Sequence, residues 1–211
     1  CIALASQGFG QLQNIPCTGY NADVVANGTG STASSTTTDA DGVAYVFIDA
    51  TFKTKNSCST ESSNCWVTSL PTTGTSKLTY TLQPANPGAG LGNDLRILSG
   101  SSGELTVDTP ISVSTLYALV SGGSGSCETT VSVNFTDESS QVFTGLTVPD
   151  WCTGSNAVST EFYRTLRSTQ TTTCSTNEIY PKMYELELEL LPENIYRKVK
   201  SITFTNGEGT A

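Results

Sequence analysis

The sequence predicts an all-β protein, a two-sheet antiparallel sandwich of jelly-roll type, and three observations support this class. Short segments rich in β-branched and aromatic residues recur along the chain, separated by Gly, Ser, Asn and Asp residues that favour turns. The segment MYELELEL at 183–190 alternates apolar and acidic residues, the pattern of a half-buried strand. Only 14% of residues are charged, below the roughly 25% of an average soluble protein.

The expected strands follow from these local patterns. CETTVSVNFTD and SQVFTGLTV are expected to form a hairpin around ESS, and GGSGS at 122–126 a turn. PENIYRKVK has Pro in a plausible first turn and basic residues at its end, so we allow at most one short helix near 192–198. The strands expected in chain order are 22–27, 43–49, 77–83, 94–98, 103–108, 112–121, 127–137, 140–148, 157–166, 183–190 and 201–206.

The first eleven residues, CIALASQGFGQ, are predicted to be a signal-peptide remnant, with an apolar run followed by small residues. A lipidated N-terminal Cys1 and a genuine first strand are the alternatives. The signal interpretation predicts that residues 1–10 pack poorly and that Cys1 has no disulfide partner. Residues 12–211 then form a single sandwich domain. Because the chain ends in TNGEGTA without a closing element, we expect this domain to be truncated at its C-terminal end.

The seven cysteines predict disulfides in an oxidising compartment, because they are scattered and none forms a CxxC pair. Without Cys1 an even number remains. Proximity favours Cys58–Cys65 and Cys152–Cys174, and elimination leaves Cys17–Cys127.

Composition excludes several function classes. The net charge is −9 with no histidine, so there is no basic patch for nucleic acid, no His-dependent nucleophile system and no His-ligated zinc. No apolar run reaches the about 18 residues that span a membrane. An acidic, weakly charged surface is compatible with neutral sugars, with cations such as calcium, or simply with solubility.

Several phrases together resemble a recurrent module of secreted and surface proteins of the Bacteroidota, which are exported through the type IX secretion system. They are TGYNADVVANGTGSTASSTTTDADGVAYVF, LYALVSGGSG, VNFTDESSQVFTGLTVPDW and VKSITFTN. The module is similar in layout to galactose-binding-like β-sandwiches. The resemblance covers most of residues 12–206 and implies an extracellular or cell-surface location and a sandwich fold. The internal cysteines depart from the pattern.

DADG at 39–42 predicts a calcium site, because Asp39 and Asp41 lie on one turn whose glycine permits tight curvature. Asn21 and Asp23 are the candidates for further oxygen ligands. The alternative is an Asp-rich turn whose carboxylates bond their own backbone. A calcium ion, structural in role, is the only cofactor that we predict.

Two polar loops are predicted to contact a ligand. VPDWCTGSN offers Asp150, Trp151 and Asn156, and GNDLR offers Asn93, Asp94 and Arg96. Carbohydrate sites combine an aromatic platform with amide, carboxylate or guanidinium hydrogen bonds. The alternative for Trp151 is a core residue beside Cys152.

The predicted function is therefore an extracellular, non-catalytic carbohydrate-binding module of a larger secreted or surface protein, with a glycan as its partner. A structural or adhesion spacer is the alternative. A polysaccharide-acting enzyme is the less favoured third hypothesis, because the acidic row Glu185, Glu187 and Glu189 lies on one strand face and glycosidases need two carboxyls across a cleft.

Overall fold

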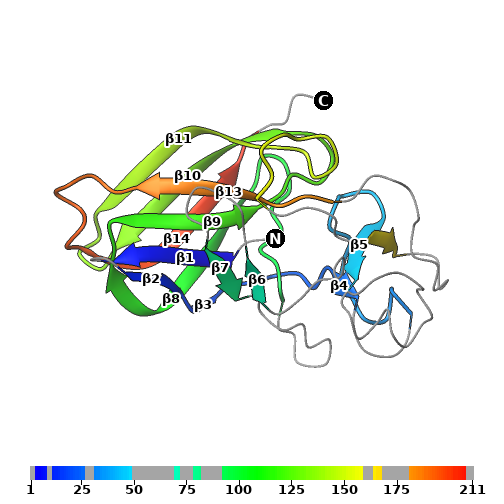
Figure 1. The fold of residues 1–211 in the computed structure, drawn as a ribbon, viewed down its shortest axis with the longest axis horizontal. Coiled ribbons are helices and arrows are strands. Elements are labelled where there is room, and N and C mark those ends of the chain that lie inside the picture. The colour runs from blue at the N-terminus through cyan, green and yellow to red at the C-terminus, as the bar shows by residue number, and fades with distance from the viewer. Residues whose placement is uncertain are drawn as a thin grey trace.

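The computed structural model describes residues 3–8, 11–26, 31–48, 69–71, 78–81, 92–158, 164–167 and 181–207, and no described residue is helical (Figure 1). The prediction of an all-β fold is confirmed. Within the described residues, no helix is long and apolar enough to cross a membrane. The strands are β1 (Ala3–Gly8), β2 (Gln11–Asn14), β3 (Cys17–Thr18), β4 (Val25–Ala26), β5 (Tyr45–Ile48), β6 (Ser69–Pro71), β7 (Thr79–Thr81), β8 (Ser102–Ser112), β9 (Thr115–Val120), β10 (Cys127–Phe135), β11 (Ser140–Val148), β12 (Arg164–Leu166), β13 (Tyr184–Glu189) and β14 (Lys198–Asn206).

Two larger sheets face each other across the main core. One has the order β13-β9-β1-β2 and the other the order β11-β10-β14-β8-β3. Their facing side chains form one apolar cluster, to which Leu116 on β9, Leu188 on β13, Val133 on β10 and Ile202 on β14 all contribute. The pairings within these two sheets are antiparallel. This arrangement is a sandwich, and its jelly-roll connectivity stays a prediction.

The strand predicted from MYELELEL is confirmed as β13. Tyr184, Leu186 and Leu188 are buried in the core between the sheets, whereas Glu187 and Glu189 are exposed. A strand places successive side chains on opposite faces, so an alternating sequence buries one face only. The hairpin of β10 and β11 is also confirmed, with Asn134 opposite Ser140 beside the connecting turn.

A second apolar core lies on the outer face of the four-stranded sheet. All six residues of β9 are buried, because Leu116, Ala118 and Val120 point into the sandwich while Tyr117 and Leu119 join this second core. The small sheet β12-β5-β4 and the hairpin β6-β7 lie on this side of the molecule, and their pairings include the parallel pair β4–β5. The run TLYALV therefore does not alternate between apolar and exposed polar residues, because one face of β9 is covered by the main core and the other by the second core.

The predicted poor packing of residues 1–10 is wrong for Ala3–Gly8. This segment forms β1, an interior strand that pairs with β9 on one side and β2 on the other. Weak alternation did not prevent strand formation, because the backbone groups of β1 find partners on both neighbours and strand propensity depends strongly on such context. Cys1 lies outside the described residues.

Two local predictions are also corrected. Residues 94–98 form no strand and contribute one isolated bridge, Ala22↔Asp94. Their backbone instead bonds side chains, as when Asn21 Nδ2 donates to the Arg96 carbonyl and Asn206 Nδ2 to the Ile97 carbonyl. Residues 192–196 form turns, and the allowed short helix is absent there. The basic residues after them begin β14, which pairs with both β8 and β10.

Candidate ligand-binding groove

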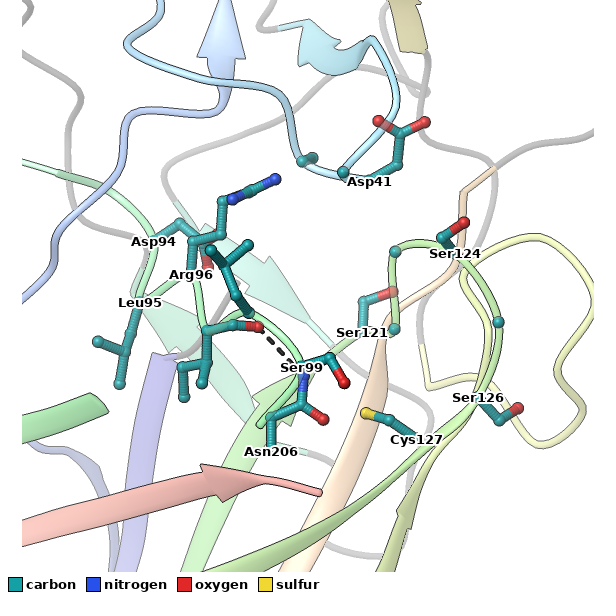
Figure 2. Close-up of a pocket in the computed structure, with 17 residues that line it drawn as sticks. Asp41, Asp94, Leu95, Arg96, Ser99, Ser121, Ser124, Ser126, Cys127 and Asn206 are labelled. Atoms are coloured by element: carbon teal, nitrogen blue, oxygen red, sulfur yellow. Dashed lines mark hydrogen bonds between the residues drawn. The ribbon is translucent and has the colours of Figure 1, made fainter. Parts of the chain in front are cut away.

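A groove of about 420 Å³ opens where β9 ends and β10 begins (Figure 2). Its walls are the turn at 40–42, the segment 94–99 and the loop 121–127, with Asn206 at the end of β14 below them. These segments are far apart in the sequence. The volume falls within the roughly 300–1,000 Å³ of typical small-molecule sites. Figure 2 shows the serine-bearing loop on one side of the groove and Arg96 on the other.

The loop 121–127 is held in place by Asp150. Asp150 Oδ2 accepts a hydrogen bond from the Gly125 N–H at 2.9 Å, and its Oδ1 accepts from the backbone N–H groups of Cys152 and Thr153. Burial opposes ionisation of Asp150, but these bonds outweigh it and hold its pKa below its usual value. Asp150 was predicted to contact ligand; the structure places it as an anchor of the groove wall.

Glycine is required at two positions of this loop. A Cβ at Gly122 would lie 2.7 Å from the Gly125 carbonyl oxygen, and a Cβ at Gly123 would lie 2.6 Å from Cα of Asp41. The loop and the 39–42 turn therefore approach each other backbone to backbone. The serines that follow these glycines place hydroxyl groups along the groove, with Ser124 and Ser126 both in its lining.

The DADG turn makes the contacts expected of an Asp-rich turn whose carboxylates bond their own backbone, which was the alternative to a calcium site. Asp41 Oδ1 accepts from the backbone N–H groups of Val43, Ala44 and Tyr45 at 2.9–3.0 Å. Asp39 Oδ1 accepts from the Gly42 N–H, and it forms an ion pair with Arg96 at 2.9 Å. Within the part of the chain that the structure describes, no three acidic or thiol side chains group as metal ligands do.

Asn21 and Asp23, the other predicted calcium ligands, are bound within the protein. Asn21 Nδ2 donates to the Arg96 carbonyl and its Oδ1 accepts from the Arg96 N–H, so its amide pairs with the backbone of the groove segment. Asp23 Oδ1 accepts from the Val25 N–H and from Asn93 Nδ2. Burial raises the pKa of Asp23, although both bonds lower it. The calcium site stays a prediction, and these contacts favour a structural role for each side chain.

Of the three residues predicted from GNDLR, Asp94 and Arg96 line the groove. Asn93 is buried and does not line it; its Oδ1 accepts from the Val24 N–H at 3.1 Å. The Arg96 side chain is 20% exposed, and its charge is balanced by Asp39. Asp94 is buried, and its carbonyl accepts from the backbone N–H groups of Asn21 and Ala22. The charge of Arg96 is therefore balanced by Asp39, while the acidic residues Asp41 and Asp94 also lie in the groove lining.

Trp151 is a core residue. It is 4% exposed, with its ring edge-on to Phe47 at 5.7 Å and to Tyr45 at 6.4 Å between centroids. The Arg164 guanidinium lies 5.2 Å from its ring centroid. Trp151 thus joins the second core to the loop after β11 and offers no platform to a ligand. Asn156 is exposed, has a φ of +61° and is absent from the groove lining.

The predicted disulfide between Cys17 and Cys127 is absent, because both are free thiols. Cys17 lies on β3 and Cys127 on β10, and β8 and β14 separate these strands. Three strand spacings amount to about 14 Å, whereas bridged Cα atoms lie within about 7 Å. Cys152 is also a free thiol and accepts a hydrogen bond from Arg164. Cys58, Cys65 and Cys174 lie outside the described residues.

Sequence reasoning missed most of the groove. Its serines were assigned only to a turn, and Cys127 was assigned to a disulfide. In Figure 2 the Cys127 thiol points from the start of β10 toward Ser99 and Asn206. Burial raises the pKa of this thiol above its usual value. The available signal was the run SGGSGSC, whose glycines allow close backbone approach and whose serines supply hydroxyl groups.

No family model, no curated protein and no solved structure matches this chain. The resemblance to type IX secretion cargo modules therefore stays a prediction.

Proposed function

We propose that this chain is an extracellular, non-catalytic binding module of a larger secreted or surface protein, and that it holds a neutral, hydroxyl-rich ligand of the carbohydrate class in the groove. The observation that carries the proposal is the groove itself. It combines a typical ligand-site volume with serine hydroxyls, glycine backbone, the acidic residues Asp41 and Asp94, and an arginine whose charge is balanced by Asp39. A neutral polyol forms hydrogen bonds with these groups without bringing a charge of its own.

The acidic row on β13 supports the non-catalytic part of the proposal. Glu185, Glu187 and Glu189 project from the face of β13 opposite the main core and do not line the groove. The Tyr80 hydroxyl donates to Glu185 at 2.8 Å, so this carboxylate takes part in packing β7 on the sheet. Asp41, which does line the groove, is buried, and its Oδ1 accepts three backbone hydrogen bonds. The three glutamates are therefore outside the groove, whose acidic lining residues are Asp41 and Asp94, and Asp41 is bound to the backbone of its own turn rather than facing a partner carboxyl across a cleft.

A second candidate is a structural or adhesion spacer without a small ligand, and the burial of Trp151 favours it. Among the described residues that line the groove there is no aromatic side chain, so a sugar held by them lacks a stacking surface and binds through hydrogen bonds. A spacer, however, has no need of an open groove between three converging segments. We therefore place the binding module first.

The test is a glycan array probed with the chain and two variants. Arg96→Ala removes the guanidinium from the groove wall, while Arg197→Ala removes an arginine that pairs with Asp137 at the opposite end of β10. We expect Arg96→Ala to lose binding at least tenfold and Arg197→Ala to keep it. Retention of no glycan by the wild-type chain contradicts the binding proposal and leaves the spacer.

A further inference from the structure

A smaller pocket adjoins the groove. This cavity, called the throat, has a volume of about 80 Å³ and shares Leu95, Ile97, Ser121, Cys127 and Asn206 with the groove lining. A water molecule needs about 10–15 Å³ of such volume. The throat is therefore large enough for a chemical group of several heavy atoms.

The walls of the throat come from both sheets of the sandwich. Val120 on β9 and Leu186 on β13 line it from one sheet, and Val148 on β11 and Phe204 on β14 from the other. These four residues belong to the main core. The space between the sheets is thus open at the groove, with apolar side chains around the opening. Protein cores are normally packed without voids larger than a water molecule. An apolar group that enters the throat leaves water and gains dispersion contacts with these core side chains.

The two compartments differ in chemistry. The groove lining mixes serine hydroxyls and charged side chains with three large aliphatic residues. Among the described residues, the throat lining has five aliphatic residues and one phenylalanine, with polar groups only at Ser121, Thr129 and Asn206 beside the Cys127 thiol. We infer that the ligand is a neutral sugar that carries a short alkyl or acyl substituent, with the sugar in the groove and the substituent in the throat. This inference rests on the proposed function and narrows its ligand class.

Cys127 lies at the junction and supplies an occupancy readout. It is half-buried, lines both compartments and is a free thiol. A substituent in the throat therefore lies beside the Cys127 side chain. Alkylation of Cys127 by N-ethylmaleimide, quantified residue by residue by mass spectrometry, therefore reports whether the throat is occupied. Cys17 and Cys152, which do not line the throat, are internal controls.

The experiment compares three probes: methyl β-D-glucoside, hexyl β-D-glucoside and 1-hexanol. Each buried methylene contributes about 0.8 kcal/mol, or about fourfold in affinity. We expect hexyl glucoside to protect Cys127 at a concentration at least tenfold below that of methyl glucoside, and hexanol to protect it more weakly than hexyl glucoside. Val148→Leu adds one methylene to the throat wall. It should reduce the difference between the concentrations at which hexyl and methyl glucoside protect Cys127.

The outcomes separate the two proposals. Equal protection by methyl and hexyl glucoside overturns the inference and leaves the carbohydrate proposal standing. Protection by hexanol as strong as that by hexyl glucoside keeps the throat as an apolar site but contradicts a sugar in the groove. Protection by none of the probes overturns the inference. Because the wild-type chain carries these comparisons, a failure of Val148→Leu to fold does not affect them.

Discussion

Replacement of Trp151 by alanine tests whether this residue is a core residue or a ligand platform. The side chain is 4% exposed, and its removal leaves a cavity beside Phe47 and Tyr45. Truncation of a buried Trp costs about 3–5 kcal/mol. The two edge-to-face ring contacts account for about 0.5–1.5 kcal/mol each of what is lost. We expect Trp151→Ala to lower the free energy of unfolding by about 3–5 kcal/mol.

The assay is urea unfolding followed by far-UV circular dichroism, which does not depend on tryptophan fluorescence. The matched control is Tyr196→Ala, because the Tyr196 side chain is 72% exposed and aromatic. A surface substitution of this kind changes stability by less than about 1 kcal/mol. If Trp151→Ala is as stable as Tyr196→Ala, the packing argument for Trp151 is wrong and a platform role becomes the better interpretation.

Four further predictions concern individual residues. Tyr80→Phe should lower the free energy of unfolding by about 1.5–3 kcal/mol in urea, because it removes a part-buried hydrogen bond to the Glu185 carboxylate. Tyr117→Phe should lower it less, because the bond of Tyr117 to Glu187 is longer, at 3.4 Å. Equal losses in the two variants would contradict this reasoning. The raised pKa of Asp23 means that the folded state binds this proton more tightly than the unfolded state does, so Asp23 favours folding more as pH falls through its folded-state pKa. Asp23→Asn should remove that gain in stability, measured by thermal melts over a range of pH. The same pH profile in the variant and the wild type would count against this prediction. The lowered pKa of Asp150 has the opposite sign, so its stabilisation is present at neutral pH and is lost on acidification; Asp150→Asn should therefore cost stability at neutral pH and little in acid. Gly123→Ala should cost about 1–3 kcal/mol, because its Cβ would lie 2.6 Å from Cα of Asp41, and a thermal melt identical to wild type would show that the two loops separate easily.

Strand identity was predictable wherever one physical pattern dominated. The alternation at 183–190 and the β-branched runs on either side of ESS correspond to β13 and to the β10–β11 hairpin. The prediction failed where neighbours decided the outcome. Ala3–Gly8 lacks a strong strand pattern and is a strand because β9 and β2 pair with it, whereas 94–98 alternates polar and apolar residues at its start and is not a strand.

The candidate site was only partly predictable, because it is assembled from remote segments. Asp94 and Arg96 were expected to contact ligand and do line the groove, but Asp150 and Asn93 stabilise nearby loops instead. A short polar side chain in a loop looks the same in sequence whether it bonds its own backbone or faces a ligand. Only the positions of the surrounding N–H groups distinguish the two cases.

The sequence by itself determined the all-β class, the period-2 faces and the acidic, histidine-free composition, because these depend on residues close together in the chain. Tertiary structure alone decided which cysteines are neighbours, which face of β9 meets the second core and where the groove opens. The physical reason is that strand order is set by contacts between residues far apart in sequence. Those contacts put two strands between Cys17 and Cys127, and they bring the 39–42 turn against Gly123.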